Sequence, residues 1–280
     1  MERADGFAER VSIVNLGDLL IKRPAGEHRT EAKVAGQLVY AVGDIHGCYE
    51  LGRDLLSYIR ADCELRAQGR RPVLIFLGDY IDRGPRSKDV LEAMVWLQRH
   101  SDWELHMLKG NHEQCLLSFL EDPTGWLRWL KFGGAETLQS YNIELPSIED
   151  AQNAARASME LLDAMPASHH VFLQNLETFI SIGDYAFVHA GVRPGISFEK
   201  QILDDLLWIR DDFVTEEARF ERVVVHGHTW RSNQPEILPN RICVDTGAYE
   251  TGVLTAVCIE DGQIRVLQVA GRERPMHRRQ

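Results

Sequence analysis

The chain has 280 residues, 44% of them hydrophobic, and a formal net charge of −11. This length and composition are ample for one well-buried α/β core. The acidic balance argues against a nucleic-acid groove, which needs a basic surface, and no apolar stretch approaches the ~18 residues of a membrane span.

The cysteines and the N-terminus predict a cytoplasmic protein. The five cysteines show no C-x-x-C spacing, and two fall in expected core strands, which predicts reduced and mostly buried thiols. Charges interrupt the first residues throughout, so they lack the pattern of a signal peptide. The five are Cys48, Cys63, Cys115, Cys243 and Cys258.

Residues 1–36 are predicted to form an N-terminal extension draped over a single domain that spans residues 37–270. Within the domain, β-branched apolar runs predict strands, and apolar residues repeated on one face predict helices. The predicted strands are Leu38–Val42, Val73–Leu77 and Leu105–Leu108, and the predicted helices are Cys48–Arg60 and Ser87–Gln98.

Residues 114–180 are predicted to form a helical cap, which turn signals interrupt at Asp122–Gly125 and Phe132–Gly134. Its aromatic residues have two interpretations. They pack the cap onto the sheet, as buried aromatics commonly do, or some of them line the mouth of a site. These residues are Trp126, Trp129, Phe132 and Tyr141.

Strands return after Asp184. Two apolar runs, Val253–Ile259 and Ile264–Val269, flank Glu260-Asp261-Gly262-Gln263 and predict a hairpin. Residues 271–280 form a basic tail that is predicted to be solvated and mobile.

Three glycine-bounded turns carry the polar residues that indicate chemistry. Each follows one of the predicted strands and therefore lies at a strand's carboxyl end, where ligands collect in open α/β sheets. Asp, His and Asn suit Mn, Fe or Zn, and the second turn adds an arginine, so the pattern indicates a metal site that handles phosphate. The turns are Gly43-Asp44-Ile45-His46-Gly47, Gly78-Asp79-Tyr80-Ile81-Asp82-Arg83-Gly84 and Gly110-Asn111-His112-Glu113.

The order of these motifs resembles the signature of the phosphoprotein phosphatases, a family of binuclear calcineurin-like metallophosphoesterases. Phe187-Val188-His189-Ala190-Gly191 and Val225-His226-Gly227-His228-Thr229 resemble the family's fourth and fifth motifs. Leu207–Arg210 and Val244–Ala248 are similar to segments of the bacterial and phage branch, the bacteriophage lambda type. The resemblance covers most of the chain, from about Gln37 to about Val269.

The resemblance implies a four-layer α/β/β/α sandwich with two mixed sheets and a helical cap. It also implies two divalent metal ions, Mn in vitro with Fe or Zn as alternatives. Two metals ~3.5–4 Å apart lower the pKa of a shared water and clamp the phosphate. The implied ligands are Asp44 and His46 at the first metal, Asp79 as the bridge, and Asn111, His189 and His228 at the second.

The resemblance further implies an acid and a grip on phosphate. His112 would protonate the leaving group, and Asp82 would orient His112. Arg83 would bind phosphoryl oxygens through its planar fork, and Arg210 resembles a second such arginine of the phage-type branch.

Three residues beside the motifs keep two interpretations each. His226 precedes the residues that match the family's fifth motif. We therefore expect it to support the site or to lie in the core rather than to bind metal. Arg193 is either a further phosphate ligand or half of a structural ion pair. Glu113 is expected to support the site rather than to bind metal.

The predicted activity is that of a metal-dependent phosphomonoester hydrolase, a serine/threonine protein phosphatase with dual or tyrosine specificity also open. It would use a metal-activated hydroxide without a phosphoenzyme, and its partner would be a phosphoprotein or phosphopeptide. The nearest alternative is a symmetrical diadenosine tetraphosphatase or another small-molecule phosphohydrolase. An inactive phosphoprotein-binding domain is the alternative of another class, against which the intact acid His112 argues.

Overall fold

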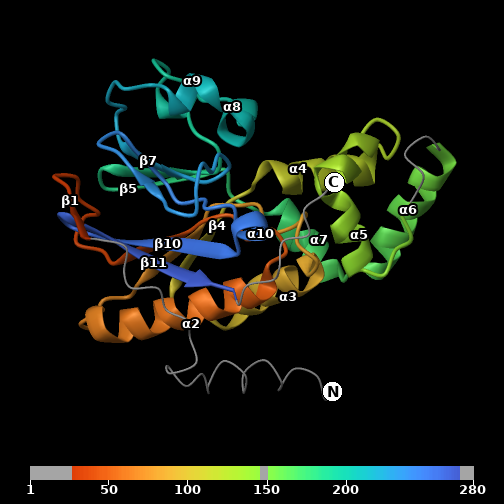
Figure 1. The fold of residues 1–280 in the computed structure, drawn as a ribbon, viewed down its shortest axis with the longest axis horizontal. Helices are drawn as coiled ribbons and strands as arrows, with labels where there is room; N and C mark the ends of the chain where they lie inside the picture. The colour runs from red at the N-terminus through yellow and green to blue at the C-terminus, as the bar shows by residue number, and fades with distance from the viewer. Residues whose placement is uncertain (1–26, 146–150, 272–280) are drawn as a thin grey trace.

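The computed structural model describes residues 27–145 and 151–271. Two mixed sheets lie face to face, and helices cover the outer face of each sheet, so the molecule has four layers with a cap at one end (Figure 1). The predicted fold class is therefore confirmed. The basic tail from Arg272 on and the first 26 residues of the predicted extension lie outside the described residues.

The first sheet has six strands. Across the sheet they are β1 (Glu27–Arg29), β11 (Gln263–Ala270), β10 (Val253–Glu260), β2 (Val39–Val42), β3 (Val73–Phe76) and β4 (Glu104–Met107). The strands β2, β3 and β4 are parallel, whereas β10 runs antiparallel to β2 and forms the predicted hairpin with β11. Because parallel strands end at the same edge, the turns after β2, β3 and β4 are brought together.

The second sheet has five strands. Across it they are β5 (Phe179–Ile182), β6 (Tyr185–Val188), β7 (Val223–His226), β9 (Arg241–Cys243) and β8 (Glu236–Ile237). The strands β6, β7 and β9 are parallel. Their carboxyl ends therefore also share one edge.

The core between the sheets explains why the strands are continuous apolar runs in the sequence. Val39 and Ala41 of β2 face Phe187 and Val225 of the second sheet, whereas their neighbour Tyr40 packs on the helical side. Successive side chains of a strand point to opposite faces, so a strand covered on both faces needs apolar residues at every position.

Helices cover both outer faces. α2 (Tyr49–Arg66) and α3 (Ser87–His100) pack on the first sheet, and η2 (Phe198–Lys200), α8 (Leu203–Trp208) and α9 (Asp211–Val214) lie over the second (Figure 1). α2 is longer than predicted. Its buried positions Leu51, Leu55, Ile59 and Cys63 continue every fourth residue, which keeps one apolar face along the whole helix.

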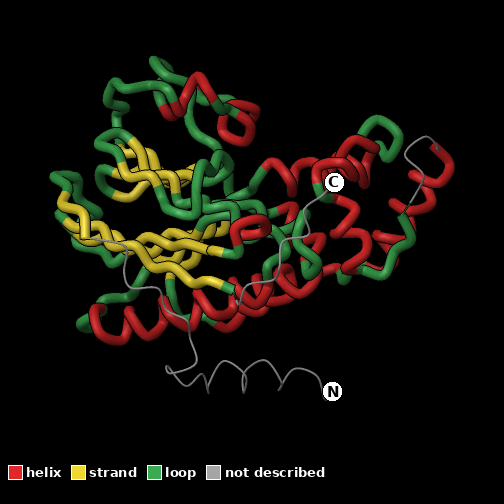
Figure 2. Tube along the Cα trace, viewed as in Figure 1, coloured by secondary structure: helices red, strands yellow, loops and turns green. Residues whose placement is uncertain are grey.

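The cap consists of α4 (Asn111–Glu121), η1 (Leu127–Phe132), α5 (Gly134–Ser140), α6 (Ala151–Ala164) and α7 (Ala167–Gln174), which form the helical end of the molecule in Figure 2. The two predicted interruptions separate α4 from η1 and η1 from α5. Trp129 and Tyr141 are buried, as the packing interpretation predicts, whereas Phe132 is 42% exposed.

The described part of the predicted extension belongs to the domain. The strand β1 pairs with β11 at the sheet edge, and Val34 is buried in the core between the sheets. The boundary at Gln37 stays a prediction, but residues 27–36 add an edge strand to the first sheet.

The five cysteines, all of them in the described part of the chain, are free, and four are buried, which agrees with the predicted reduced thiols. Among the described helices, none has both the length and the apolar composition that crossing a bilayer would require.

Candidate active site

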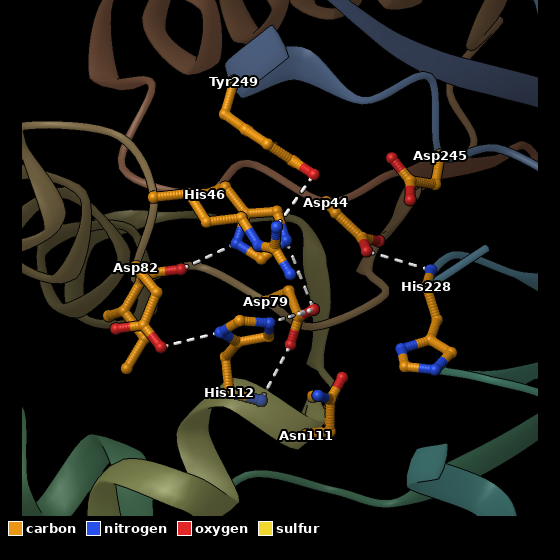
Figure 3. Close-up of polar contacts among 12 residues, drawn as sticks. Asp44, His46, Asp79, Asp82, Asn111, His112, His228, Asp245 and Tyr249 are labelled. Atoms are coloured by element: carbon orange, nitrogen blue, oxygen red, sulfur yellow. Dashed lines mark hydrogen bonds and ion pairs between the residues drawn. The ribbon is translucent and has the colours of Figure 1, made fainter. Parts of the chain in front are cut away.

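Five strand ends bring the motif residues together. The turns after β2, β3 and β4 carry the first three motifs, and His189 and His228 follow β6 and β7 of the facing sheet. Figure 3 shows side chains from these turns converging on Asp79. α4 begins at Asn111, so its first turn presents Asn111 and His112 to the same place.

Two clusters of metal-binding atoms share Asp79. His46, Asp79 and His112 form one cluster, and Asp79, His189 and His228 form the other, with the ligand atoms of each within 4.8 Å of one another. The Asp79 Oδ2 atom lies 3.4 Å from Nε2 of His46 and 3.4 Å from Nε2 of His189. This position between two groups is what a bridging carboxylate requires.

The histidine tautomers aim Nε2 at the clusters. Nδ1 of His46 lies 2.8 Å from the carbonyl oxygen of Ile81, and Nδ1 of His189 lies 2.9 Å from that of Leu77. A carbonyl can only accept, so each Nδ1 carries the proton and each Nε2 is left unprotonated. Nε2 of His189 also lies 2.9 Å from Oδ1 of Asn111. The hydrogen bond at Nδ1 is the usual way in which a protein orients a metal-binding imidazole.

Burial keeps the ligand histidines neutral. It lowers the pKa of His46 to about 3 and the pKa of His228 well below its ordinary value. It also lowers the pKa of His189, against the charge of Asp79. Neutral imidazole is the form that binds metal.

Unpartnered buried atoms show that the residues fit a cation. Oδ2 of Asp44 accepts the backbone N–H of His228 at 2.9 Å, but Oδ1 of Asp44 and Nε2 of His228 are buried with no hydrogen-bond partner among the described residues. Buried polar atoms are normally satisfied. A carboxylate oxygen and an imidazole nitrogen are both donors that Mn, Fe or Zn accepts.

Asp245 is a further carboxylate at this site. Its carboxylate lies beside that of Asp44 in Figure 3. Burial raises the pKa of Asp245 to about 7, and burial, Asp245 and Asp79 raise the pKa of Asp44 well above its ordinary value. The Val244–Ala248 segment was noticed in the sequence as a family likeness, but nothing in it signalled that Asp245 faces Asp44.

The backbone of the site is strained. Eight non-glycine residues in the described part of the chain have positive φ, and five of them are site residues. Each such residue costs ~1–3 kcal/mol and persists only where its surroundings hold it. The five are His46, Asp79, Asp82, Arg83 and His228, with φ of 45°, 52°, 71°, 66° and 64°.

Two motif glycines are explained by close approach. A Cβ on Gly110 would lie 2.0 Å from Oδ1 of Asp79, and a Cβ on Gly227 would lie 2.0 Å from Oδ1 of Asp44. Both glycines therefore make room for a carboxylate that faces the clusters.

Glu113 braces the second and third turns, as the preferred interpretation predicts. Its fully buried carboxylate accepts the backbone N–H groups of Gly110, Asp79 and Tyr80 at 2.8–2.9 Å. These bonds tie the turn after β3 to the start of α4.

His112, a member of the first cluster, forms a buried pair with Asp82. His112 Nδ1 lies 2.7 Å from Asp82 Oδ2, and His112 Nε2 lies 3.9 Å from Asp79 Oδ2. Burial lowers the pKa of His112, but the Asp79 charge and the Asp82 hydrogen bond outweigh it and raise that pKa above its ordinary value. His112 can therefore keep a proton near neutral pH, as a general acid must.

The two predicted phosphate-binding arginines influence different histidines of the clusters. The charge of Arg83 lowers the pKa of His46 and His112, whereas the charge of Arg210 lowers that of His189 and His228. Arg83 donates to the Tyr249 hydroxyl at 2.9 Å and its guanidinium lies 4.7 Å from that ring. Tyr249 was not singled out from the sequence.

The structure decides two of the open interpretations. Arg193 forms ion pairs with Asp205 and Asp212, so it is a structural residue. His226 is buried against Phe213, with ring centroids 4.9 Å apart, and belongs to neither metal cluster.

The cavity between α2 and α3 lies apart from these residues. Its volume is about 410 Å³, and Leu56, Leu97 and Trp103 are among the residues that line it. None of the lining residues belongs to the candidate site, so the site is defined by its polar geometry alone.

The geometry is that of a metal-dependent hydrolase, and comparison with known proteins identifies the family. The calcineurin-like phosphoesterase family profile matches residues 38–252. The chain belongs to this family of metallophosphoesterases, whose members normally use divalent metals.

Relatives within the family carry different activities in their names. The chain is 30% identical over 230 residues to serine/threonine-protein phosphatase 2 of Escherichia coli (strain K12), covering 78% of this chain and 90% of the relative. It is 27% identical over 233 residues to the asymmetrical bis(5'-nucleosyl)-tetraphosphatase PrpE of Bacillus mycoides (strain KBAB4), covering 77% and 88%.

A solved structure supports the fold. It is provisionally described as a diadenosine tetraphosphatase and superposes with a TM-score of 0.58 at 21% identity, covering 88% of this chain and 98% of the other.

Proposed function

We propose that this phosphoesterase is a protein phosphatase that hydrolyses phosphoserine and phosphothreonine. The observation that carries the proposal is the buried His112–Asp82 pair beside Asp79. A serine or threonine alkoxide is a poor leaving group, so its expulsion depends on proton donation. A nucleotide leaves as a far weaker base and depends on that proton less.

The residues take the following roles in this proposal. Asp44, His46, Asp79, Asn111, His189 and His228 hold two divalent ions, with Mn, Fe and Zn all compatible with the donor set. Bound there, the ions supply an activated water and neutralise phosphate charge.

Arg83 and Arg210 grip phosphoryl oxygens through planar donors suited to bidentate binding. His112 donates its Nε2 proton to the leaving oxygen, and Asp82 holds the Nδ1–H and so fixes the orientation of the ring. No side chain has to form a bond to phosphorus, so no phosphoenzyme is required.

The competing substrate is a dinucleoside tetraphosphate, which a named relative supports. The test compares kcat/KM for matched phosphoserine, phosphothreonine and phosphotyrosine peptides with that for diadenosine tetraphosphate, after metal is added back to chelator-treated protein. We expect phosphoserine and phosphothreonine peptides to be preferred over the dinucleotide by at least about 10-fold, ~1.4 kcal/mol in the barrier.

Three results would redirect the proposal. A preference for the dinucleotide would make the protein a tetraphosphatase. An advantage of about 100-fold for phosphotyrosine, ~2.7 kcal/mol, would make it a tyrosine phosphatase. Phosphopeptide binding without release of phosphate would make it a binding domain.

A further inference from the structure

We propose that the helical cap positions the acid: Trp129 and Thr137 hold the Asp82 carboxylate, and through it they set the orientation of His112. This inference rests on the proposed function, in which His112 protonates the leaving group. Trp129 and Thr137, termed here the Asp82 clamp, both donate to the Asp82 carboxylate and belong to neither metal cluster. Thr137 also contacts Ser87 Oγ at 3.0 Å.

Three donors surround the Asp82 carboxylate, which is fully buried. Oδ2 accepts from His112 Nδ1 and from Trp129 Nε1, both at 2.7 Å, and Oδ1 accepts from the Thr137 hydroxyl at 2.6 Å. A buried carboxylate stays ionised only when such donors compensate for lost water. The clamp supplies two of the three.

Thr137 also holds the main chain of Asp82. Its Oγ1 accepts the Asp82 backbone N–H at 3.0 Å while its hydrogen points to the Asp82 carboxylate. Asp82 has a φ of 71°, a left-handed conformation that a non-glycine residue adopts only when neighbours enforce it. Ser87 Oγ accepts the same N–H at 3.0 Å, so Thr137 and Ser87 together fix the backbone of Asp82, and Thr137 also holds its side chain.

These hydrogen bonds determine which nitrogen of His112 donates to Asp82. The indole N–H can only donate, and an ionised carboxylate can only accept, so the His112 Nδ1 must donate to Asp82. The Nε2 is then left to face the clusters. Without the clamp, the Asp82 carboxylate could rotate about its broad terminal torsion, and the imidazole would lose its fixed aim.

The cap meets the same turn at a second residue. The carbonyl oxygen of Gly133 accepts the backbone N–H of Arg83 at 3.1 Å. Trp129 is in turn packed against Phe119 of α4, with ring centroids 5.0 Å apart. The junction of η1 and α5 thus supports both the partner of the acid and the adjacent phosphate-binding arginine.

Kinetics on metal-loaded enzyme test the clamp. Thr137→Val removes the hydroxyl at constant shape, Thr137→Ser restores it, and Trp129→Phe removes the N–H but keeps a ring. Tyr141→Phe is the matched control, because the hydroxyl of this buried cap residue is hydrogen-bonded to His169 and not to Asp82. Unfolding midpoints and metal content establish that each variant is folded and loaded.

We expect Thr137→Val and Trp129→Phe to lower kcat on an alkyl phosphate by about 10–100-fold, the usual effect of losing a supporting hydrogen bond. The loss on p-nitrophenyl phosphate should be much smaller, because its leaving group hardly needs a proton. KM should change little. Thr137→Ser should recover most of the alkyl phosphate rate, and Tyr141→Phe should match the wild type.

A second measurement needs no turnover. In the Zn²⁺-loaded protein, the hydrogen-bonded Nδ1 proton of His112 should give an exchange-protected imidazole NMR signal in wild type, Thr137→Ser and Tyr141→Phe. The signal should be lost in Thr137→Val and Trp129→Phe. If it persists in both, or if both variants lose rate equally on the two substrates, the clamp is refuted.

The two proposals can fail separately. A wild-type protein that hydrolyses no phosphomonoester would refute the proposed function, and the imidazole signal would still decide whether the clamp orients His112.

Discussion

The strand-end turns and the cap both bury polar groups, but they satisfy them differently. At the turns, Asp44 Oδ1 and His228 Nε2 are buried without a hydrogen-bond partner among the described residues. In the described parts of the cap, residues 114–145 and 151–176, every buried side-chain nitrogen and oxygen has one. The turns therefore keep donor atoms that fit a cation, whereas the described parts of the cap are satisfied by protein groups alone.

The largest expected effect on the turns is that of Asp79→Asn. Since Asp79 belongs to both clusters, we expect metal content to fall from about two equivalents per chain and kcat/KM to fall by at least ~10³-fold, about 4 kcal/mol. Elemental analysis and phosphatase assays measure both. His226→Gln is the control, as this buried neighbour lies outside the clusters. A variant that kept both metals would remove the bridging role.

His112→Asn tests the residue at which the metal-binding turns and the cap meet. The side chain belongs to the first cluster but is hydrogen-bonded to Asp82, which the cap holds. We expect metal content to be largely kept and kcat on an alkyl phosphate to fall by roughly 10²–10⁴-fold, the range of a positioned general acid. The loss on p-nitrophenyl phosphate should be smaller, and equal losses on both substrates would argue against leaving-group protonation.

Arg210→Ala probes a group outside both regions. Losing a charge-assisted hydrogen bond of ~1.5–3 kcal/mol should weaken inhibition by inorganic phosphate about 10–100-fold. Arg193→Ala is the matched control, because Arg193 is engaged by Asp205 and Asp212 and should leave phosphate inhibition unchanged. Product-inhibition constants for the two variants decide whether Arg210 contacts phosphate.

The smallest expected effect is on the stability of the metal-free protein. Burial raises the pKa of Asp245 to about 7, and an acid whose folded pKa is raised stabilises the fold at low pH and loses that stability as pH rises through the folded pKa. Between pH 6.5 and 8 the chelator-treated protein should therefore lose about 1 kcal/mol relative to its Asp245→Asn variant, which lacks this titration.

Urea unfolding of the wild type and of Asp245→Asn at the two pH values, with and without added metal, measures this loss. Both proteins carry the same buried histidines and the same Glu113, which also titrate in this window, so their contributions cancel in the difference. Added divalent metal should abolish the dependence, because it pairs with the carboxylates. A difference between the two metal-free proteins that stays constant from pH 6.5 to 8 would contradict the raised pKa of Asp245.

The sequence by itself determined the three parallel strands of the first sheet, its hairpin, the two covering helices and the motif turns of this protein. These features are local. An apolar run with β-branched residues specifies a buried strand wherever it pairs. The glycines before Asp79 and Asn111 are recognisable in the sequence, but the contacts that require them run between the turns after β3 and β4. The six ligand candidates came from the resemblance of the motif order to the family signature.

Only the tertiary structure decided which distant residues complete the site. Trp129 and Thr137 reach Asp82 across 47 and 55 residues, and Asp245 faces Asp44 across the two sheets. No periodicity encodes such single contacts, because each depends on how separate helices and strands pack. For the same reason Arg193 could be assigned to an ion pair only once α8 and α9 were placed beside it.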